Sequence, residues 1–262
     1  MSLALSAGLP RAATDELARC VAVLEGTSLP VRLAALVGDS VESLKRRLPA
    51  ALQSRLEGAV RLALATALRA ALASDPAVAQ GAWLHRGLLG ASGAVGGAFG
   101  LAGTLVELPI STTLLLRQVA AIAAAEGEDL DDPAVQAECL KVFALGAQDS
   151  RDDAAESGYF ALRLTLAQTL QGAVGRSLGQ VMPGLLAAVA ARFGAPVGVK
   201  LAAQAAPVVG AASGAAVNLA FLEHYRAVAR AHFAVRRLER THGTTAVRAA
   251  YERLKDAPFA AA

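Results

Sequence analysis

The 262-residue chain has few aromatic side chains and little charge. Aromatic residues make up 4% of it and charged residues 18%, while hydrophobic residues reach 55%. Globular domains typically hold about 45–50% apolar and about 25% charged residues. Stacking on aromatic side chains carries much of the affinity for single-stranded nucleic acid, so we expect no nucleic-acid partner. The apolar excess is mostly alanine, leucine and valine, a composition that favours helices with thin side chains.

The chain also lacks the residue spacings of common metal sites and catalytic motifs. Its two cysteines, Cys20 and Cys139, lie far apart, so we expect buried, reduced thiols of a cytosolic protein. His224 and His232 lie eight residues apart on one predicted helix, about 12 Å along its axis, and cannot bind one ion together. We expect either histidine to be a hydrogen-bonded core residue instead. No HExxH, GxSxG or GK[ST] motif is present. The sequence therefore predicts no metal and no cofactor.

Apolar residues recur at three- and four-residue steps along much of the chain, and no stretch alternates between apolar and polar residues. We predict an all-α fold, a single multi-helix domain with no sheet. The clearest helices are expected at residues 49–74, 132–145, 223–240 and 243–255. Asp132 followed by Pro133 is a strong helix start. Within the domain we separate an N-terminal helical region, residues 1–80, from a main helical part, residues 81–256. The first ten residues have no basic start and no sustained apolar run, so no signal peptide is expected.

Two long apolar segments are rich in glycine and proline. Residues 87–106 contain no charge and seven glycines, and after Glu107-Leu108-Pro109 the apolar sequence resumes over residues 110–125. Residues 181–222 form the second segment, which we expect to be divided at Pro183, Gly194, Pro196 and Pro207. We predict a helical hairpin in each segment. Glycine costs about 1 kcal/mol relative to alanine in an exposed helix, so this many glycines indicates close backbone contact between helices.

The length of these segments leaves three structures open. About 20 apolar residues suffice to cross a bilayer, but few residues of the first segment strongly favour lipid. A soluble core packed through glycines, a peripheral or re-entrant membrane contact, and a full crossing all fit.

Four charged residues interrupt the apolar segments, namely Glu107, Arg117, Arg192 and Lys200. A charge in an apolar environment is costly unless it is paired. We predict that Glu107 pairs with Lys200 or with Arg117, between the two hairpins.

The C-terminal part of the chain is basic. Between Arg226 and Lys255 there are eight basic and two acidic residues, a local net charge of +6, while the whole chain has +3. Four arginines form one stripe on the predicted helix: Arg226, Arg230, Arg237 and Arg240. Such a stripe either contacts an anionic membrane surface or is a solvated face over a core.

Several short motifs occur in an order that resembles the EcsC protein family of bacteria. They are Glu107-Leu108-Pro109, Arg117, Glu138-Cys139-Leu140, Glu156-Ser157-Gly158-Tyr159, Arg163, Arg192-Phe193-Gly194, Lys200, Pro207-Val208-Val209-Gly210-Ala211, Asn218, His224, His232-Phe233 and Arg236-Arg237-Leu238-Glu239-Arg240. The resemblance spans about residues 85–251, and Glu107 stands where the family usually has aspartate. Because the family is named after a member encoded beside an ABC transporter, the resemblance implies such a transporter as a membrane-protein partner. It implies no catalytic residue.

The resemblance also selects residues for a shared site. These candidates are Glu107, Lys200, Asn218, His224, His232 and Arg237, and we add Arg117 from the first apolar segment.

We therefore expect a cytoplasmic, membrane-associated accessory protein, peripheral to or partly inserted in the inner face of the membrane. Its hairpins would pack or insert, and its basic helix would contact anionic lipid or a membrane protein. The alternative is an enzyme or small-ligand-binding protein whose polar site is enclosed by the hairpins. That site would draw on Glu107, Lys200, Asn218, His224 and His232. A soluble scaffold for protein partners is the third hypothesis.

Overall fold

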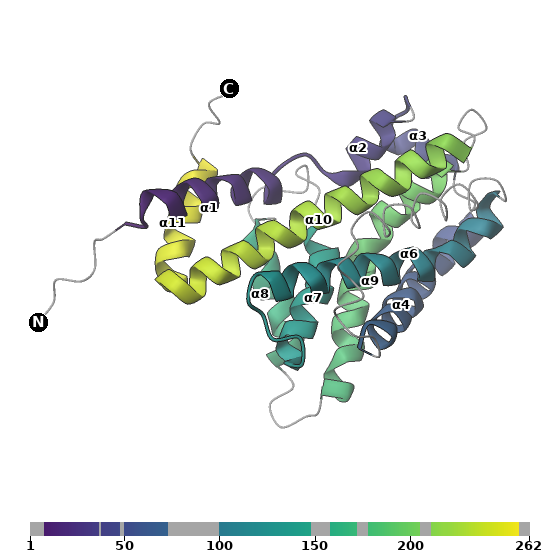
Figure 1. The fold of residues 1–262 in the computed structure, drawn as a ribbon. Helices are drawn as coiled ribbons and strands as arrows, with labels where there is room; N and C mark the ends of the chain where they lie inside the picture. Colours follow the sequence, from purple (N-terminus) through teal and green to yellow (C-terminus); the bar gives the residue numbers. More distant parts are fainter. Residues whose placement is uncertain are drawn as a thin grey trace, which may run out of the picture.

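The computed structural model describes residues 8–36, 38–47, 50–72, 100–147, 158–171, 178–204 and 211–256. Within these ranges the chain is helical and contains no strand, which confirms the predicted all-α class. The helices are α1 (Arg11–Leu24), α2 (Leu29–Leu36), α3 (Val41–Arg47), α4 (Ala50–Leu72), α6 (Gly100–Ala125), α7 (Pro133–Leu145), α8 (Tyr159–Gln171), α9 (Leu178–Gln204), α10 (Ala211–His242) and α11 (Thr244–Asp256) (Figure 1). They pack into one helical domain.

Helix ends are the best-predicted feature of the fold. Asp132 caps α7 by accepting a hydrogen bond from the Ala134 backbone N–H at 2.8 Å, and Pro133 follows in the first turn. Gly127 ends α6 with a φ of 79°, and Gly243 separates α10 from α11 with a φ of 88°. Both lie in the left-handed region that glycine adopts without steric cost.

The described prolines of the apolar segments do not divide the helices as predicted, and Pro207 lies outside the described residues. Pro109 lies inside α6, and Pro183 and Pro196 lie inside α9. Close to Pro109, a side-chain hydroxyl satisfies a backbone carbonyl: Thr113 Oγ1 donates a hydrogen bond to the Pro109 carbonyl at 2.8 Å. Around Pro196, tertiary packing outweighs the lost hydrogen bond, since the second half of α9 is enclosed by other helices.

α9 is the central helix of the domain. It packs against α2, α3, α4, α6, α7, α8 and α10, and residues 196–203 are buried without a break. A helix buried on all sides must be apolar all round, and residues 196–203 carry one charge, Lys200. Arg192 lies before this stretch and is exposed to solvent, so its charge needs no buried partner.

α10 joins two regions that the sequence separates. It runs for 32 residues from Ala211 to His242, so the end of the second apolar segment and the basic helix are one element. α6 runs without interruption through Glu107-Leu108-Pro109, so the break predicted there is not found. Residues 87–99 of the first predicted hairpin and residues 205–210 of the second lie outside the described residues, and the hairpins stay predictions. The boundary between residues 80 and 81 lies there too. The helices before it, α1 to α4, pack on α6, α9, α10 and α11.

A glycine at the end of α7 is in close contact with another helix, whereas two glycines inside α9 are not. A Cβ atom at Gly184 or Gly194 would meet no other atom within 4 Å. At Gly146, by contrast, a Cβ would collide with Cε1 of the Tyr225 ring. The end of α7 therefore touches α10 at a place where only glycine fits.

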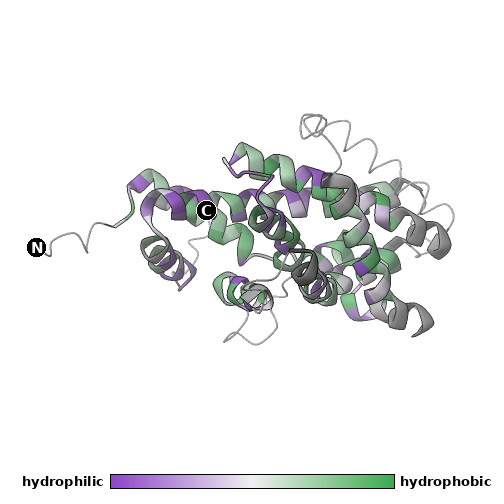
Figure 2. Ribbon diagram, turned by 90° about the horizontal axis from the view of Figure 1, so that it is seen from below, coloured by the Kyte–Doolittle hydropathy of each residue, from purple (hydrophilic) through white to green (hydrophobic). Residues whose placement is uncertain are grey.

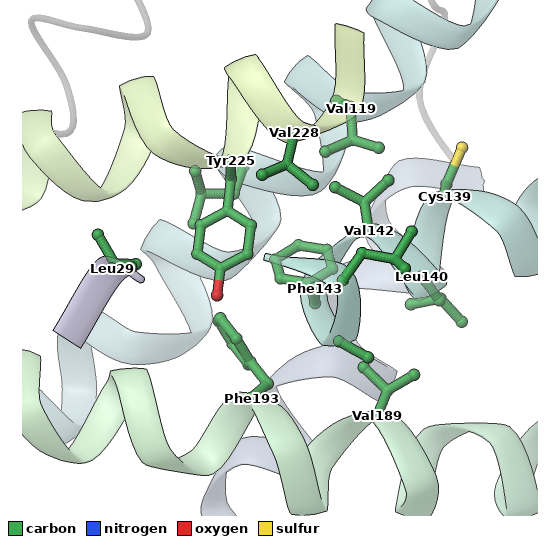
Figure 3. Close-up of a cluster of buried hydrophobic side chains, with 14 of the residues drawn as sticks. Leu29, Val119, Cys139, Leu140, Val142, Phe143, Val189, Phe193, Tyr225 and Val228 are labelled. Carbon is green, nitrogen blue, oxygen red and sulfur yellow. The ribbon is translucent and has the colours of Figure 1, made fainter. Parts of the chain in front are cut away.

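The core that surrounds this contact is built from aromatic rings of α7, α9 and α10. The Phe143 and Phe193 rings lie 4.9 Å apart edge to face, and the Tyr225 ring lies 5.5 Å from each. Figure 3 shows these rings between the aliphatic side chains of Leu29 and Val189. Both cysteines are buried free thiols, as predicted.

Charge is distributed unevenly between the two ends of the domain. Several inter-helix ion pairs join α1 and the turn between α6 and α7 to the second half of α10, a region that we call the polar end. Figure 2 shows hydrophilic stretches on the helices beside the labelled N-terminus. The opposite, apolar end contains the first halves of α6 and α10, where residues 211–222 carry no charge and residues 100–116 carry only Glu107.

Candidate functional site

A chain of buried polar side chains joins α7, α8 and α10. Nε2 of His232 lies 3.1 Å from Oε2 of Glu138, and Nδ1 of His232 lies 2.9 Å from the hydroxyl of Tyr159. Both His232 and Tyr159 have no exposed surface. We call Glu138, His232 and Tyr159 the buried triad.

Two further ion pairs extend the triad. Lys141, itself buried, donates to Oε1 of Glu138 at 2.8 Å. Arg163 donates to the Tyr159 hydroxyl at 3.3 Å and makes a two-point ion pair with Glu239, with both N–O distances at 3.1 Å. Two parallel hydrogen bonds between a guanidinium and a carboxylate fix their relative orientation.

The protonation states within the triad follow from this geometry. Burial opposes ionisation of Glu138, but the hydrogen bond from His232 and the charge of Lys141 hold the pKa of that carboxyl well below its usual range. An ionised carboxylate only accepts, so Nε2 of His232 donates to it and Nδ1 accepts from the Tyr159 hydroxyl. Burial lowers the pKa of His232 and raises that of Tyr159, so both are neutral near pH 7.

This arrangement fixes helices rather than presenting a reactive group. A catalytic base or nucleophile needs a free face toward its substrate, whereas both nitrogens of His232 are occupied and the ring is enclosed. The triad therefore acts in this structure as a polar connection between α7, α8 and α10, with every hydrogen-bonding atom of His232 satisfied.

A second polar cluster lies among apolar residues between α6, α9 and α10. Lys200 is 2% exposed, and its Nζ lies 3.4 Å from the Ser111 hydroxyl and 5.3 Å from the centre of the Phe221 ring. Asn218, on α10, is buried as well. Ser111 follows Glu107 by one helical turn, so the two residues share a face of α6. The predicted Glu107–Lys200 pair stays a prediction, because the Glu107 side chain lies outside the described residues.

His224 belongs to neither cluster. Its Nε2 lies 2.7 Å from the carbonyl oxygen of Gly146 and donates to it, so the side chain caps the end of α7. Burial lowers the pKa of His224 to about 4. This histidine is therefore a neutral hydrogen-bond donor near pH 7, which is consistent with the core role expected from the sequence.

Most of the predicted arginine stripe faces carboxylates. Arg237 contacts Glu16 at 2.6 Å and Glu126 at 2.8 Å, Arg240 pairs with Glu128, and Arg226 pairs with Glu223 at 3.0 Å. The side chain of Arg230 is exposed. Arg240 also donates to the Glu126 carbonyl at 2.7 Å, which satisfies the C-terminal end of α6. The contact of these four arginines with lipid stays a prediction.

The structure distributes the sequence-predicted candidates over three places. Lys200 and Asn218 lie at the apolar end, His224 caps α7, and His232 and Arg237 lie toward the polar end. Arg117 is half-buried on α6. Three residues of the central network, Glu138, Tyr159 and Arg163, were not among the predicted site residues, although each occurs in a motif that carries the resemblance. Their presence in these motifs was the signal that could have selected them.

Within the described part of the chain, no group of three or more histidine, cysteine or acidic side chains is arranged to hold a metal ion. Two helices are long and apolar enough to cross a membrane by length and composition, over Leu108–Ala125 and Met182–Ala203. Half of the first window and 67% of the second are buried inside the domain.

Comparison with known proteins agrees with the resemblance noted above. The model of the EcsC protein family matches residues 27–238, a segment that starts earlier and ends earlier than the motifs suggest. Neither the search of curated proteins nor that of solved structures finds a match. Because the family model matches most of the chain, from before α2 into the second half of α10, the chain belongs to the EcsC protein family.

Proposed function

We propose that this EcsC-family protein is a cytoplasmic accessory protein that binds the inner face of the membrane through apolar side chains of α4 and α6. The observation that carries the proposal is the exposure of large apolar residues on these two adjacent helices. Leu62 on α4 is 63% exposed, and Ile110 on α6 is 53% exposed. α4 and α6 pack directly on each other.

The burial of the two apolar helices favours a peripheral contact over a crossing. α9 forms the centre of the domain and would have to leave seven other helices to enter lipid. Half of the apolar window of α6 is not fully buried, and Ile110 within it is exposed, which leaves room for shallow contact. Burying one leucine-sized side chain contributes about 1.5–3 kcal/mol, so two exposed residues supply appreciable affinity.

The ion pairs at the polar end support a contact that depends little on salt. Three of the four arginines of the stripe already have carboxylate partners, and a paired arginine attracts lipid phosphate less than a free one does. An anionic-lipid contact through the stripe therefore rests chiefly on Arg230, whereas the apolar contact through α4 and α6 needs no charge.

Flotation of the full chain with liposomes tests this proposal. We expect binding to vesicles of neutral and of anionic lipid that persists at 1 M NaCl. Leu62→Glu combined with Ile110→Glu should weaken it at least tenfold, by the loss of apolar burial. Leu164→Glu is the matched control, because Leu164 is also 53% exposed but lies on α8, which packs on α7 and α9.

Other outcomes would assign the membrane contact to the arginine stripe or rule out a contact through α4 and α6. Binding that requires anionic lipid and disappears at high salt would assign it to the arginine stripe. A protein that never floats, or a double variant that floats like the wild type, would rule out the proposed contact through α4 and α6.

The Lys200 cluster favours a second candidate function, the binding of a small anionic ligand within the domain. Lys200 and Asn218 are buried among apolar side chains, and the buried Thr112 hydroxyl has no hydrogen-bond partner. A ligand retained there should appear as added mass in native mass spectrometry of the purified full chain. Lys200→Met should remove it, and a wild-type chain of bare mass would exclude such a tightly held ligand.

A further inference from the structure

Helices α6 and α10 lie side by side and run in the same direction. At the polar end, Arg237 contacts Glu126, which precedes it by 111 positions. Farther along, Nζ of Lys200 lies 3.4 Å from the Ser111 hydroxyl and 5.3 Å from the centre of the Phe221 ring, and the last two residues are 110 positions apart. A difference in residue number that stays constant along two helices identifies a parallel pair, whereas an antiparallel pair keeps a constant sum. Figure 1 shows both helices starting at the same end of the molecule.

This register places two exposed apolar side chains at one level. Leu219 of α10 is 36% exposed and follows Ile110 of α6, which is 53% exposed, by 109 positions. Because this difference nearly equals that of the contacts above, the two residues lie within about one helical turn of each other along the axes. α6 also packs on α4, which exposes Leu62. Three neighbouring helices, α4, α6 and α10, therefore each expose a large apolar side chain.

The surface of α10 changes from apolar to charged directly after this level. Residues 211–222 carry no charge. Glu223 follows Leu219 by one turn, and its side chain is 40% exposed and pairs with Arg226 at 3.0 Å. Arg230, which is exposed, lies about 16 Å beyond Leu219 along the helix. Because the transfer of an ion pair into lipid is costly, a contact of α10 with a bilayer has to end between Leu219 and Glu223.

We propose that Leu219 is a third membrane anchor, and that α6 and α10 approach the bilayer with their N-terminal ends while the polar end stays in water. The proposal rests on the membrane contact through α4 and α6 proposed above, and it adds α10 and an orientation. A bilayer fits this surface because its apolar interior is bounded by a polar layer, just as residues 211–222 are followed by the Glu223–Arg226 pair.

Fluorescent labels at single introduced cysteines test the proposal on the full chain. Both native cysteines are buried, so an environment-sensitive thiol label reacts at the introduced position. With vesicles of neutral lipid, we expect the emission of a label at Leu219→Cys to rise about twofold or more, as at Ile110→Cys, because both positions enter an apolar environment. The emission at Arg230→Cys and at Leu164→Cys should not change, because both positions remain in water.

Flotation of Leu219→Ser with the same vesicles measures the contribution of the third anchor. Because Leu219 is already partly buried in its own domain, its loss should weaken binding about two- to fivefold. Val23→Ser is the matched control, since Val23 is 39% exposed but lies on α1 at the polar end, and it should bind like the wild type. Wild-type binding by a folded Leu219→Ser chain would overturn the third anchor. If this variant fails to fold, the labelled chains still decide.

The outcomes separate this proposal from the one on which it rests. Labels at Leu62→Cys and Ile110→Cys that respond while the label at Leu219→Cys does not would overturn the third anchor and leave the contact through α4 and α6. A response at both Leu219→Cys and Arg230→Cys would show that α10 lies flat on the bilayer, and would overturn the proposed orientation. No response at any position, together with no flotation, would overturn both proposals.

Discussion

At the scale of single residues, Glu138 is the position of the polar network that we expect to be least tolerant of substitution. It accepts hydrogen bonds from His232 and Lys141, and Nη1 of Arg236 lies 3.5 Å away. Glu138→Gln leaves a buried lysine without its counter-charge, so we expect a loss of about 3–5 kcal/mol in the free energy of unfolding. Urea denaturation at pH 7 measures it.

The matched control for this change is Glu223→Gln. Glu223 also pairs with a basic residue three positions away, but 40% of its side chain is exposed, and exposed pairs contribute about 0.2–1 kcal/mol. Equal losses in the two variants would show that burial of the Glu138 charge has no energetic weight.

His224 gives stability a dependence on pH. Its pKa falls from 6.5 in the unfolded chain to about 4 in the folded one. Between these values the unfolded chain binds more protons, so this contribution is full above pH 6.5 and is lost as the pH falls toward 4. The difference corresponds to roughly 3 kcal/mol.

His224→Gln isolates this contribution, because glutamine keeps an N–H donor for the Gly146 carbonyl and does not titrate. We expect the stability of the wild type to fall more steeply between pH 6.5 and 4 than that of the variant, by thermal or urea denaturation at matched pH values. Parallel curves for the two proteins would exclude His224 as the source of the pH dependence.

Contacts between residues far apart in the sequence are the part of the candidate site that a single sequence does not predict. Glu138 and His232 are 94 positions apart, and Tyr159 and His232 are 73 apart. Periodicity identifies the buried side of each helix but not the residue that a neighbouring helix places opposite it. His232 was therefore predicted as a hydrogen-bonded core residue while its partners were not identified. For the same reason, the sequence did not reveal that acidic residues of the α6–α7 turn lie opposite the arginine stripe.

At the scale of helices, two glycines of α7 and α9 are expected to respond in opposite directions to the same substitution. Gly146→Ala places a Cβ against the buried ring of Tyr225, and overpacking of this kind costs about 1–3 kcal/mol. Gly194→Ala meets no neighbour within 4 Å and should stabilise the protein by up to about 1 kcal/mol, because alanine favours the helix. Thermal unfolding of both variants provides the comparison, and destabilisation by Gly194→Ala would contradict it.

Helix boundaries follow from sequence where local chemistry decides them, and not where packing does. Asp132 and Gly243 act through their own side chain or backbone conformation, and each marks a helix boundary as predicted. Gly127 ends α6 in the same local way. Pro109 and Pro196 were expected to interrupt helices, but the surrounding structure keeps α6 and α9 continuous. The number of helices that surround α9 is a property of the fold, and no local pattern contains it.

At the scale of the whole molecule, the uneven distribution of charge predicts that the two ends differ in their response to salt. The polar end is held by partly exposed ion pairs, such as those of Arg237 with Glu16 and Glu126. At 1 M NaCl the screening length is about 3 Å, so these pairs weaken. The fully buried stretch of α9, residues 196–203, depends on apolar packing that sodium chloride does not screen.

Hydrogen exchange at 0.05 M and 1 M NaCl therefore should separate the two ends. Several pairs of about 0.2–1 kcal/mol each fasten α1 and the α6–α7 turn, so we expect their amides to exchange about five- to thirtyfold faster at high salt. The amides of residues 196–203 should not accelerate. Arg237→Gln should reproduce part of the effect in α1 at low salt, because the same contact with Glu16 is lost. If α1 and α9 accelerate together, the ion pairs stabilise the domain as one unit, and the polar end is not a separately opening part of it.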